Sequence, residues 1–244
     1  MNIVPSYVDI EFLRRALAED IGRGDITTIA TVPATARGKG LIRAKEPMVL
    51  CGVNLVGAVY HLLDPTLTVL ASHADGDSLK SGDLIATVSG CARSILTGER
   101  TVLNFLQRLS GIATGARSCL AMIDRRSKAR IVDTRKTTPG WRTLEKYAVS
   151  VGGCRNHRFG LDDGILIKDN HIAAAGSIIA AVKKARAAAH HLLKIEVEVT
   201  SLDEVREALN ARADIIMLDN ICLLYTSDAA DDLLCVDLGG RRII

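Results

Sequence analysis

The chain has 244 residues, of which 48% are hydrophobic and 24% charged, and its formal net charge is +3. A chain of this length forms one large or two medium-sized domains, and its apolar share and small net charge exclude an intrinsically disordered protein. The longest uncharged apolar stretch, at about residues 171–182, is shorter than the ~20 residues of a membrane-spanning helix. Asp9 and Glu11 lie where a signal peptide would be basic. We therefore expect a cytoplasmic protein that is neither secreted nor membrane-bound.

Cysteines and aromatic residues exclude two further classes. The six cysteines are scattered and form no Cys-x-x-Cys pair, which is typical of reduced thiols and not of a disulfide framework or a zinc site. The three Phe, one Trp and four Tyr are too few for the stacking platforms that bind single-stranded nucleic acid.

The first half of the chain is predicted to mix helices and short strands. Apolar spacing predicts a helix over residues 8–19, and after the Gly22–Asp25 turn either Asp25 or Thr27 is a candidate N-cap. The stretch from 36 to 84 reads as short strands separated by turns. A long helical pattern follows, which Gly111 and Gly115 weaken. The predicted strands cover 40–43, 48–51 and 66–70, and the long helix covers 95–123.

The second half alternates strands with helices. Strand–helix alternation of this kind indicates a parallel sheet or barrel with helices outside it. The predicted strands cover 129–132, 164–167, 194–199 and 214–218, and the helices cover 143–151, 177–189 and 201–211, with a candidate N-cap at Thr200–Ser201. We expect the change from one pattern to the other near residues 110–120.

Each strand of this second series ends in charged residues. Arg135 and Lys136 follow the first strand, Lys168 follows the second, Glu198 lies near the end of the third, and Asp219 follows the fourth. The carboxyl ends of barrel strands face one shared site, so these residues predict a cationic pocket with two carboxylates. The alternative interpretation is that charges gather wherever strands emerge into water.

Basic residues are concentrated between Arg125 and Arg158. This segment holds ten Arg or Lys residues against Asp133 and Glu145, a local balance of +8 in a chain of net charge +3. We expect an anionic ligand here. A basic nucleic-acid-binding module is an alternative, which the acidic Glu198 and Asp219 oppose.

The residue types favour a phosphorylated, carboxylated ligand. Arg and Lys bind phosphate and carboxylate groups, and two neighbouring carboxylates suit either ribose hydroxyls or Mg²⁺. The sequence contains no Gly-x-Gly-x-x-Gly after a strand, no Walker-type loop and no Gly-x-Ser-x-Gly elbow.

Six motifs in a fixed order make the chain recognisable. They are Glu19-Asp20-Ile21-Gly22-Arg23-Gly24-Asp25, Gly98-Glu99-Arg100-Thr101, Asp133-Thr134-Arg135-Lys136-Thr137-Thr138-Pro139-Gly140, Asn156-His157-Arg158, Ile167-Lys168-Asp169-Asn170-His171 and Ile216-Met217-Leu218-Asp219-Asn220. With these motifs the chain resembles the carboxylating nicotinate-nucleotide pyrophosphorylases, or quinolinate phosphoribosyltransferases, over about residues 7–220.

The resemblance implies a fold, a reaction and partners. It implies an α/β protein in which an N-terminal α/β sandwich domain precedes an open, incomplete α/β barrel. The implied reaction converts quinolinate and phosphoribosyl pyrophosphate into nicotinate mononucleotide, pyrophosphate and CO₂ with Mg²⁺, as a step of NAD biosynthesis. The protomers are expected to pair head to tail as a homodimer, and no nucleic acid or membrane partner is expected. A related phosphoribosyltransferase-like paralogue with another substrate is the alternative within this class.

The resemblance also implies roles for individual residues. The two carboxylates of quinolinate would be held by Arg135, His157, Arg158 and Lys168, with Arg100 contributed to the site of the partner subunit. Thr134 is expected to bind substrate, and Lys136 is expected at the pyrophosphate or the reacting carboxylate. Glu198 and Asp219 would face the ribose hydroxyls and bind Mg²⁺ directly or indirectly. Lys136, Lys168, Glu198 and Asp219 form the predicted catalytic set.

With the change of pattern near residues 110–120, we expect an N-terminal domain at residues 1–112 and a barrel domain at 113–220. The chain departs from the family in two places. Cys154 stands where the family usually has a third glycine, and we expect a strained turn if this position needs a positive φ. Residues 221–244 look like translated adapter or vector sequence, so we expect a non-native tail. The expected consequence is a barrel that lacks its closing strands and the loops for the ribose 5-phosphate, which puts the activity of this chain in question.

Overall fold

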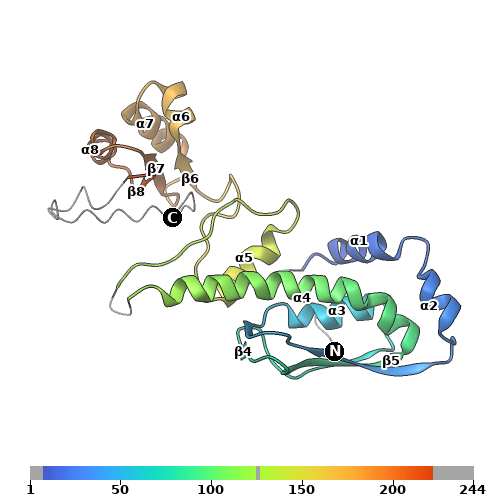
Figure 1. Cartoon of the computed structure of the whole chain (residues 1–244). Coiled ribbons are helices and arrows are strands. Elements are labelled where there is room, and N and C mark those ends of the chain that lie inside the picture. The colour runs from blue at the N-terminus through green and yellow to red at the C-terminus, as the bar shows by residue number, and fades with distance from the viewer. Residues whose placement is uncertain (1–7, 125–126, 222–244) are drawn as a thin grey trace. The chain divides into compact units, whose positions relative to one another are not determined.

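The computed structural model describes residues 8–124 and 127–221, and their contacts divide at His157/Arg158 into two units (Figure 1). We call them the N-terminal and C-terminal units. The N-terminal unit contains α1 (Ile10–Ile21), α2 (Ile26–Thr31), β1 (Arg37–Arg43), β2 (Met48–Val49), α3 (Val53–Leu63), β3 (Thr68–Ala71), β4 (Ser78–Leu79), β5 (Leu84–Cys91), α4 (Ala92–Ala121) and α5 (Arg142–Val151). The C-terminal unit contains β6 (Ile165–Ile167), α6 (Asp169–Ala175), α7 (Ile178–Ala188), β7 (Ile195–Val199), α8 (Leu202–Asn210) and β8 (Ile215–Leu218).

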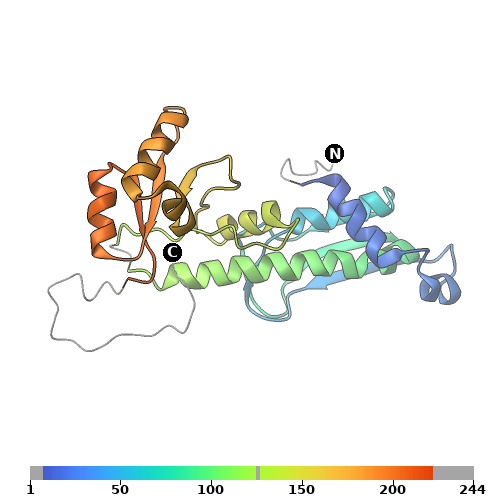
Figure 2. The same ribbon diagram turned by 90° about the horizontal axis from the view of Figure 1, so that it is seen from above.

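An antiparallel sheet and a helical layer build the N-terminal unit. The sheet has the strand order β1-β5-β3, and β2 pairs with β4 beside it. Helices α3 and α4 pack against each other and against this sheet (Figures 1 and 2). Fully buried Phe105 and Leu109 of α4 join Val56 and Val59 of α3 in one apolar core. The expected α/β N-terminal domain is therefore present.

Sequence patterning located several N-terminal elements and missed others. Asp25 is the N-cap of α2 and accepts a hydrogen bond from the backbone N–H of Thr28 at 2.9 Å. The prediction of strands and turns alone between 36 and 84 is wrong, because residues 53–63 form helix α3. Most of this helix is buried, so apolar residues surround its axis and the one-sided helical pattern is absent. Helix α6, which follows Lys168, was also not predicted.

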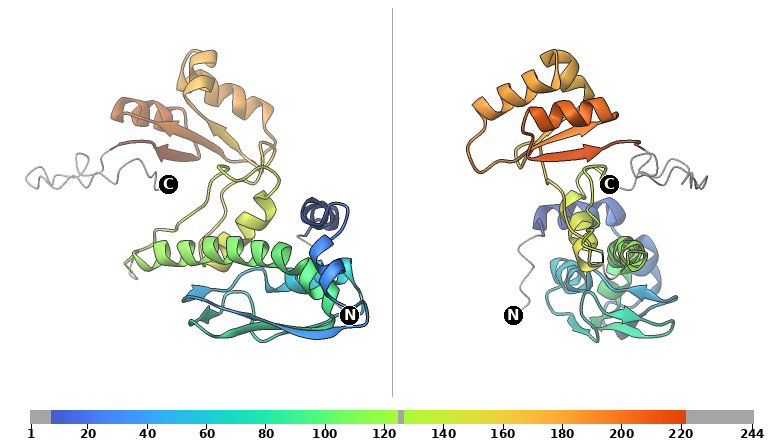
Figure 3. Two further views of the ribbon diagram at one scale, coloured as in Figure 1. Left: turned by 45° about the vertical axis from the view of Figure 1, so that its right-hand side comes forward. Right: turned by 90° about the vertical axis from the view of Figure 1, so that its left-hand side faces the viewer.

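The C-terminal unit is a three-stranded parallel sheet in the order β6-β7-β8. Helices α7 and α8 contact each other and the strands (Figure 3), and Val197, Val199 and Ile195 are buried beneath them. Ser201 is the N-cap of α8. The strand–helix alternation that the sequence predicted is confirmed over these residues.

The predicted strand at 129–132 is not formed as such. Among the described residues of this segment, only Val132 makes a strand-like bridge, in parallel with Arg155. The backbone N–H of Arg155 donates to Ile131 O at 2.8 Å and that of Asp133 donates to Arg155 O at 3.1 Å. The ladder ends there because the backbone N–H and C=O of His157 bond to the side chains of Asp133 and Lys146 and not to a neighbouring strand.

The division at His157 groups α5 with the N-terminal unit, since α5 packs on α4. The domain boundary at 112/113, which rests on the change of sequence pattern near residues 110–120, stays a prediction. The predicted non-native tail at 221–244 lies outside the described residues except for Ile221. Within the described part of the chain, no helix is both long and apolar enough to cross a membrane.

Candidate active site

Three predicted site residues lie at the carboxyl ends of the parallel strands. Lys168 follows β6, Glu198 is the penultimate residue of β7, and Asp219 follows β8. The register places Glu198 beside Met217, and the backbone N–H of Asp219 donates to Val199 O at 2.9 Å. The strand ends therefore bring one cation and two carboxylates to one edge of the sheet. The first of the four predicted strands, which Arg135 and Lys136 follow, is not part of this sheet, so the predicted rim of four strand ends is found only for the last three.

Lys168 and Glu198 form an ion pair at this edge. Lys168 Nζ lies 2.5 Å from Glu198 Oε2, and the side chains are 40% and 15% exposed. Lys168 is also the N-cap of α6, and its backbone N–H donates to Nδ1 of His171 at 3.0 Å. The backbone of Lys168 is thus fixed at the strand–helix junction, while its half-exposed ammonium group is balanced by one carboxylate.

Glu196 and Glu198 alternate along β7 and share a face, so their positions alone do not show which of the two is the functional acid. Both residues are half-buried on the same face of β7, and Glu198 is the one that contacts Lys168. Arg158 of the same unit donates from Nη1 to Gly164 O at 2.7 Å, so its side chain is held against the segment that enters β6.

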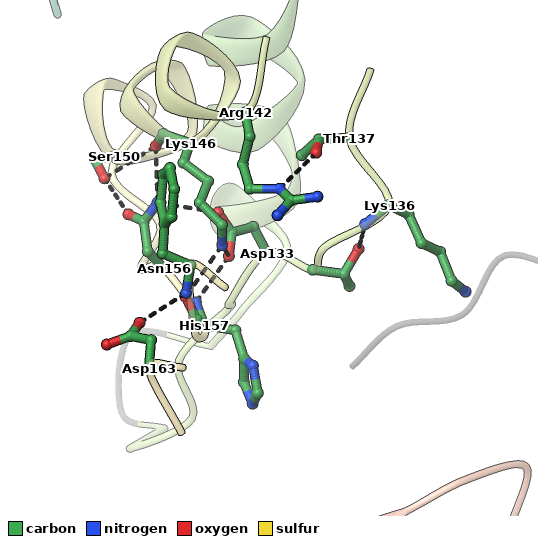
Figure 4. A network of polar contacts seen from close by, with 11 residues as sticks. Asp133, Lys136, Thr137, Arg142, Lys146, Ser150, Asn156, His157 and Asp163 are labelled. Carbon is green, nitrogen blue, oxygen red and sulfur yellow. Dashed lines mark hydrogen bonds and ion pairs between the residues drawn. The ribbon is translucent and has the colours of Figure 1, made fainter. Parts of the chain in front are cut away.

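The segment Thr134–Lys136 of the N-terminal unit forms a tight turn. Thr134 Oγ1 accepts a hydrogen bond from the backbone N–H of Lys136 at 3.0 Å. Lys136 is exposed, and its side chain points away from the neighbouring polar network (Figure 4). Arg135 is half-buried, and its Nε is buried without a hydrogen-bond partner among the described residues. A buried donor without an acceptor is costly, which marks Arg135 as a candidate ligand-binding group.

His157 is held through its backbone by a buried ion pair. Lys146 Nζ lies 2.5 Å from Asp133 Oδ1, and the side chains are 4% and 9% exposed. Asp133 Oδ1 accepts the backbone N–H of His157 at 2.7 Å, and Lys146 Nζ donates to His157 O at 3.1 Å. The imidazole ring points away from the ion pair (Figure 4), so the pair fixes the backbone and presents the ring.

A second buried acid, Glu145, holds the other end of the segment that runs from Asp133 to Thr138. Glu145 Oε2 accepts the backbone N–H of Thr138 at 3.1 Å, and Glu145 Oε1 lies 2.5 Å from Arg108 Nη2. Burial acts to raise the pKa of Glu145, but the hydrogen bonds from Arg108 and Thr138 outweigh it and hold that pKa below its ordinary value. Glu145 is therefore ionised at neutral pH.

The supporting roles of Asp133, Glu145 and Lys146 are not evident from the sequence, where these residues contribute only to the local charge balance. One signal was available: Arg142, Glu145 and Lys146 are spaced i, i+3 and i+4 and so share a helix face. That this charged face is directed inward depends on tertiary packing.

Arg100 and Cys154 can be placed, although no substrate contact of either is seen. Arg100 is exposed on α4, as its position in a predicted helix suggested. At the predicted turn Gly153 has the positive φ of 101°, whereas Cys154 is not among the non-glycine residues with positive φ. Cys154 is buried, and its Sγ donates to Ala116 O at 3.3 Å. The expected strain at Cys154 is therefore absent.

Glu198 and Asp219 are the candidate carboxylate ligands for a metal ion. Within residues 8–124 and 127–221, no group of three or more His, Cys, Asp or Glu side chains is arranged to hold a metal. Mg²⁺ commonly takes one or two protein carboxylates and completes its shell with water and substrate phosphate oxygens. Glu198 and Asp219, on adjacent strand ends, fit this limited requirement.

Family models match both halves of the chain. The model "Quinolinate phosphoribosyl transferase, N-terminal domain" matches residues 25–110, and "Quinolinate phosphoribosyl transferase, C-terminal domain" matches residues 112–237. The second match extends past residue 220, where we expected the native part to end, into residues that the structure does not describe.

Curated relatives and solved structures agree with these matches. A Bacillus subtilis (strain 168) protein named probable nicotinate-nucleotide pyrophosphorylase [carboxylating] is 48% identical over 210 residues, which are 86% of this chain and 72% of that protein. The nicotinate-nucleotide pyrophosphorylase [carboxylating] of Mycobacterium leprae (strain TN) is 47% identical, over 89% of this chain and 77% of its own. The crystal structure of NadC from Streptococcus pyogenes has a TM-score of 0.84 at 46% identity, over 90% of this chain and 77% of that chain. The nicotinate-nucleotide pyrophosphorylase structure from Francisella tularensis also has a TM-score of 0.84, at 42% identity, over 91% of this chain and 78% of that chain.

Proposed function

Because this chain belongs to the quinolinate phosphoribosyltransferase family, we propose that it transfers the phosphoribosyl group of phosphoribosyl pyrophosphate to quinolinate. The transfer releases pyrophosphate and CO₂ and gives nicotinate mononucleotide, so the chain acts as a pentosyltransferase of NAD biosynthesis. The relatives reported above are named for this chemistry, and none of them is named for nucleic-acid binding or for another substrate.

The unpaired donor of Arg135 carries the proposal. Its Nε is buried and lacks a partner among the described residues, and a guanidinium in this state is suited to donate two parallel hydrogen bonds to a planar carboxylate. Quinolinate has two adjacent carboxylates. Arg135 therefore binds one of them, with Thr134 contributing to the same turn. The family resemblance gives His157, Arg158 and Lys168 the same role toward quinolinate.

The Lys168–Glu198 ion pair prepares the site for both substrates. A quinolinate carboxylate replaces Glu198 at Lys168 Nζ, and Glu198 then accepts hydrogen bonds from the ribose hydroxyls together with Asp219. The pair is partly exposed, and partly exposed pairs contribute only about 0–1 kcal/mol, so the exchange of partners has a small cost.

Electrostatic stabilisation and positioning carry the reaction. Departure of pyrophosphate leaves positive charge at the sugar carbon, which the carboxylates of Glu198 and Asp219 stabilise. The exposed ammonium group of Lys136 offsets charge on the pyrophosphate. After the ring nitrogen is alkylated, the carbon–carboxylate bond beside it breaks and CO₂ leaves. The electron pair of that bond stays on the ring carbon, where the adjacent positive nitrogen stabilises it, and a proton from water then completes nicotinate mononucleotide. Orientation of the two substrates therefore matters more than any general base.

Mg²⁺, a homodimer and a cytoplasmic location complete the proposal. Glu198 and Asp219 would hold Mg²⁺ directly or through water, and the ion would neutralise the charge of the pyrophosphate group. Arg100 is exposed on α4, which supports a role in the site of a partner subunit. The described cysteines are free thiols, which supports a reducing compartment.

Lys168→Ala and Arg158→Ala test the proposal. We expect the unsubstituted chain to form nicotinate mononucleotide from quinolinate but not from nicotinate, and each variant to lose at least about a hundredfold in turnover with an unchanged circular dichroism spectrum. Near-normal turnover in both folded variants would contradict the site, and no product from the unsubstituted chain would contradict the activity.

A further inference from the structure

One face of α5 holds the segment that carries Arg135 and Lys136. Arg142, Glu145 and Lys146 form this face, which we call the α5 polar face. Glu145 and Lys146 are 7% and 4% exposed, although charged side chains are almost never fully buried unless they are paired. We therefore expect each of these two neighbouring buried charges to be paired with a group from another segment.

The two buried charges bind opposite ends of one segment. Lys146 pairs with Asp133, immediately before Thr134, and Glu145 accepts the backbone N–H of Thr138. Between these ends, Arg142 Nε donates to Thr137 Oγ1 at 3.0 Å. Helix α5 is thus bonded to Asp133, Thr137 and Thr138. These contacts lie on both sides of the predicted ligands Arg135 and Lys136.

The same face also holds the second predicted ligand segment. Both the N–H and the C=O of His157 are bound by the Asp133–Lys146 pair. Asn156 Nδ2 donates to Asp133 Oδ2 and to Lys146 O, both at 3.0 Å. Figure 4 shows these bonds around Lys146, with the imidazole of His157 and the side chain of Lys136 directed away from them.

We propose that the α5 polar face is a positioning element that fixes the spacing between Arg135 and His157 and thereby sets the preference for a dicarboxylate over a monocarboxylate. The inference rests on the proposed function, because it assumes that these two residues bind quinolinate. The residues of the face act through the segments they hold and do not touch substrate. A displacement of about 1 Å in such a group is enough to lower its contribution strongly.

Lys146→Met is the direct test. Affinities of the folded variant for quinolinate and nicotinate are measured by calorimetry, and hydrogen exchange of residues 133–138 and 155–158 is measured by mass spectrometry. We expect the ratio of the two affinities to fall by about tenfold or more, since two correctly spaced cationic groups are needed only for the dicarboxylate. Exchange in both segments should become faster.

A second variant guards against misfolding, because Lys146→Met leaves the carboxylate of Asp133 buried without a counter-charge. The double variant Asp133→Asn/Lys146→Met removes both charges and keeps an acceptor for the N–H of His157, while His157 O still loses its donor. The affinity ratio should fall here as well. Arg186→Met is the control, because Arg186 pairs with Asp214 in the C-terminal unit and should leave the ratio and both segments unchanged.

The outcomes separate the two proposals. An affinity ratio that stays within about twofold of the unsubstituted chain in the folded variants would overturn the positioning role, since a purely structural role lowers both affinities together. If the unsubstituted chain does not bind quinolinate, the proposed function is contradicted. In that case unchanged exchange at 133–138 and 155–158 in the variants would overturn the positioning role, and faster exchange confined to these segments would support it.

Discussion

Individual side chains at the strand ends and the 133–138 segment differ in how far the sequence identifies them. Lys168 and Asp219 were predicted from their positions after strands, and Glu198 was chosen over Glu196 by the family resemblance. The structure places Lys168 Nζ 2.5 Å from Glu198 Oε2. Asp133, Glu145 and Lys146 contribute as much to the geometry, yet Asp133 stands in a loop, and the spacing of Glu145 and Lys146 with Arg142 is also typical of a solvated helix face. Their role depends on burial, which local sequence does not specify.

Glu145 gives a pH-dependent prediction at this scale. Its pKa in the folded chain lies below the ordinary value of 4.5, so its contribution to stability is present above that pH and is lost as the pH falls through the lowered folded-state pKa. Glu145→Gln should lower the free energy of unfolding at pH 7 by about 1–3 kcal/mol and make its decline below pH 4.5 shallower.

Urea unfolding between pH 7 and pH 3 measures this effect. Asp203→Asn is the control, because the side chain of Asp203 is 90% exposed. Parallel stability curves for Glu145→Gln and the unsubstituted chain would contradict the assignment of Glu145 as a stabilising carboxylate.

Helix α4 illustrates what an element contributes beyond its local pattern. The long helical pattern was predicted despite Gly111 and Gly115, and the helix is continuous from Ala92 to Ala121. A Cβ added at either glycine would meet nothing within 4 Å. At Gly152, by contrast, an added Cβ would lie 2.5 Å from Ala116 Cβ and 2.6 Å from Ala113 O. The close approach of the end of α5 to α4 therefore depends on Gly152.

A matched pair of alanine substitutions tests this packing. Gly111→Ala should raise the free energy of unfolding by about 0.5–1 kcal/mol, since alanine is the better helix former. Gly152→Ala should lower it by about 1–3 kcal/mol through overpacking. Denaturant unfolding of both variants provides the measurement, and a stable Gly152→Ala variant would show that α4 and α5 are not in close contact.

At the scale of the whole molecule, we propose that Arg100 of one subunit acts in the active site of its partner. Arg100 belongs to the N-terminal unit and Lys168 to the C-terminal unit. Arg100→Ala and Lys168→Ala should each be inactive alone. A mixed dimer of the two variants would contain one site with both residues intact if Arg100 acts in the partner's site.

Unfolding and refolding an equal mixture of the two variants should therefore recover about a quarter of the activity of the unsubstituted protein, as expected for random pairing in a symmetric dimer. Each variant refolded alone provides the control. Absence of recovered activity, with mixed dimers detected by native mass spectrometry, would mean that Arg100 does not act across the interface.

The sequence by itself determined the family, the α/β class, the strand–helix alternation of the second half and the residues at the strand ends. These features are local: motif residues stand in order along the chain, and the period of apolar residues distinguishes strands from amphipathic helices. The same reasoning failed for α3 and for the strand at 129–132. A buried helix shows no one-sided pattern, and a strand exists only where a partner lies beside it.

Only the tertiary structure decided which charges meet. It paired Lys168 with Glu198, turned Glu145 and Lys146 of α5 inward, and left Nε of Arg135 buried without a partner among the described residues. The physical reason is that the energy of a charge depends on its burial and on the charges beside it. Both are set by segments distant in sequence, so they exist only after the chain has folded.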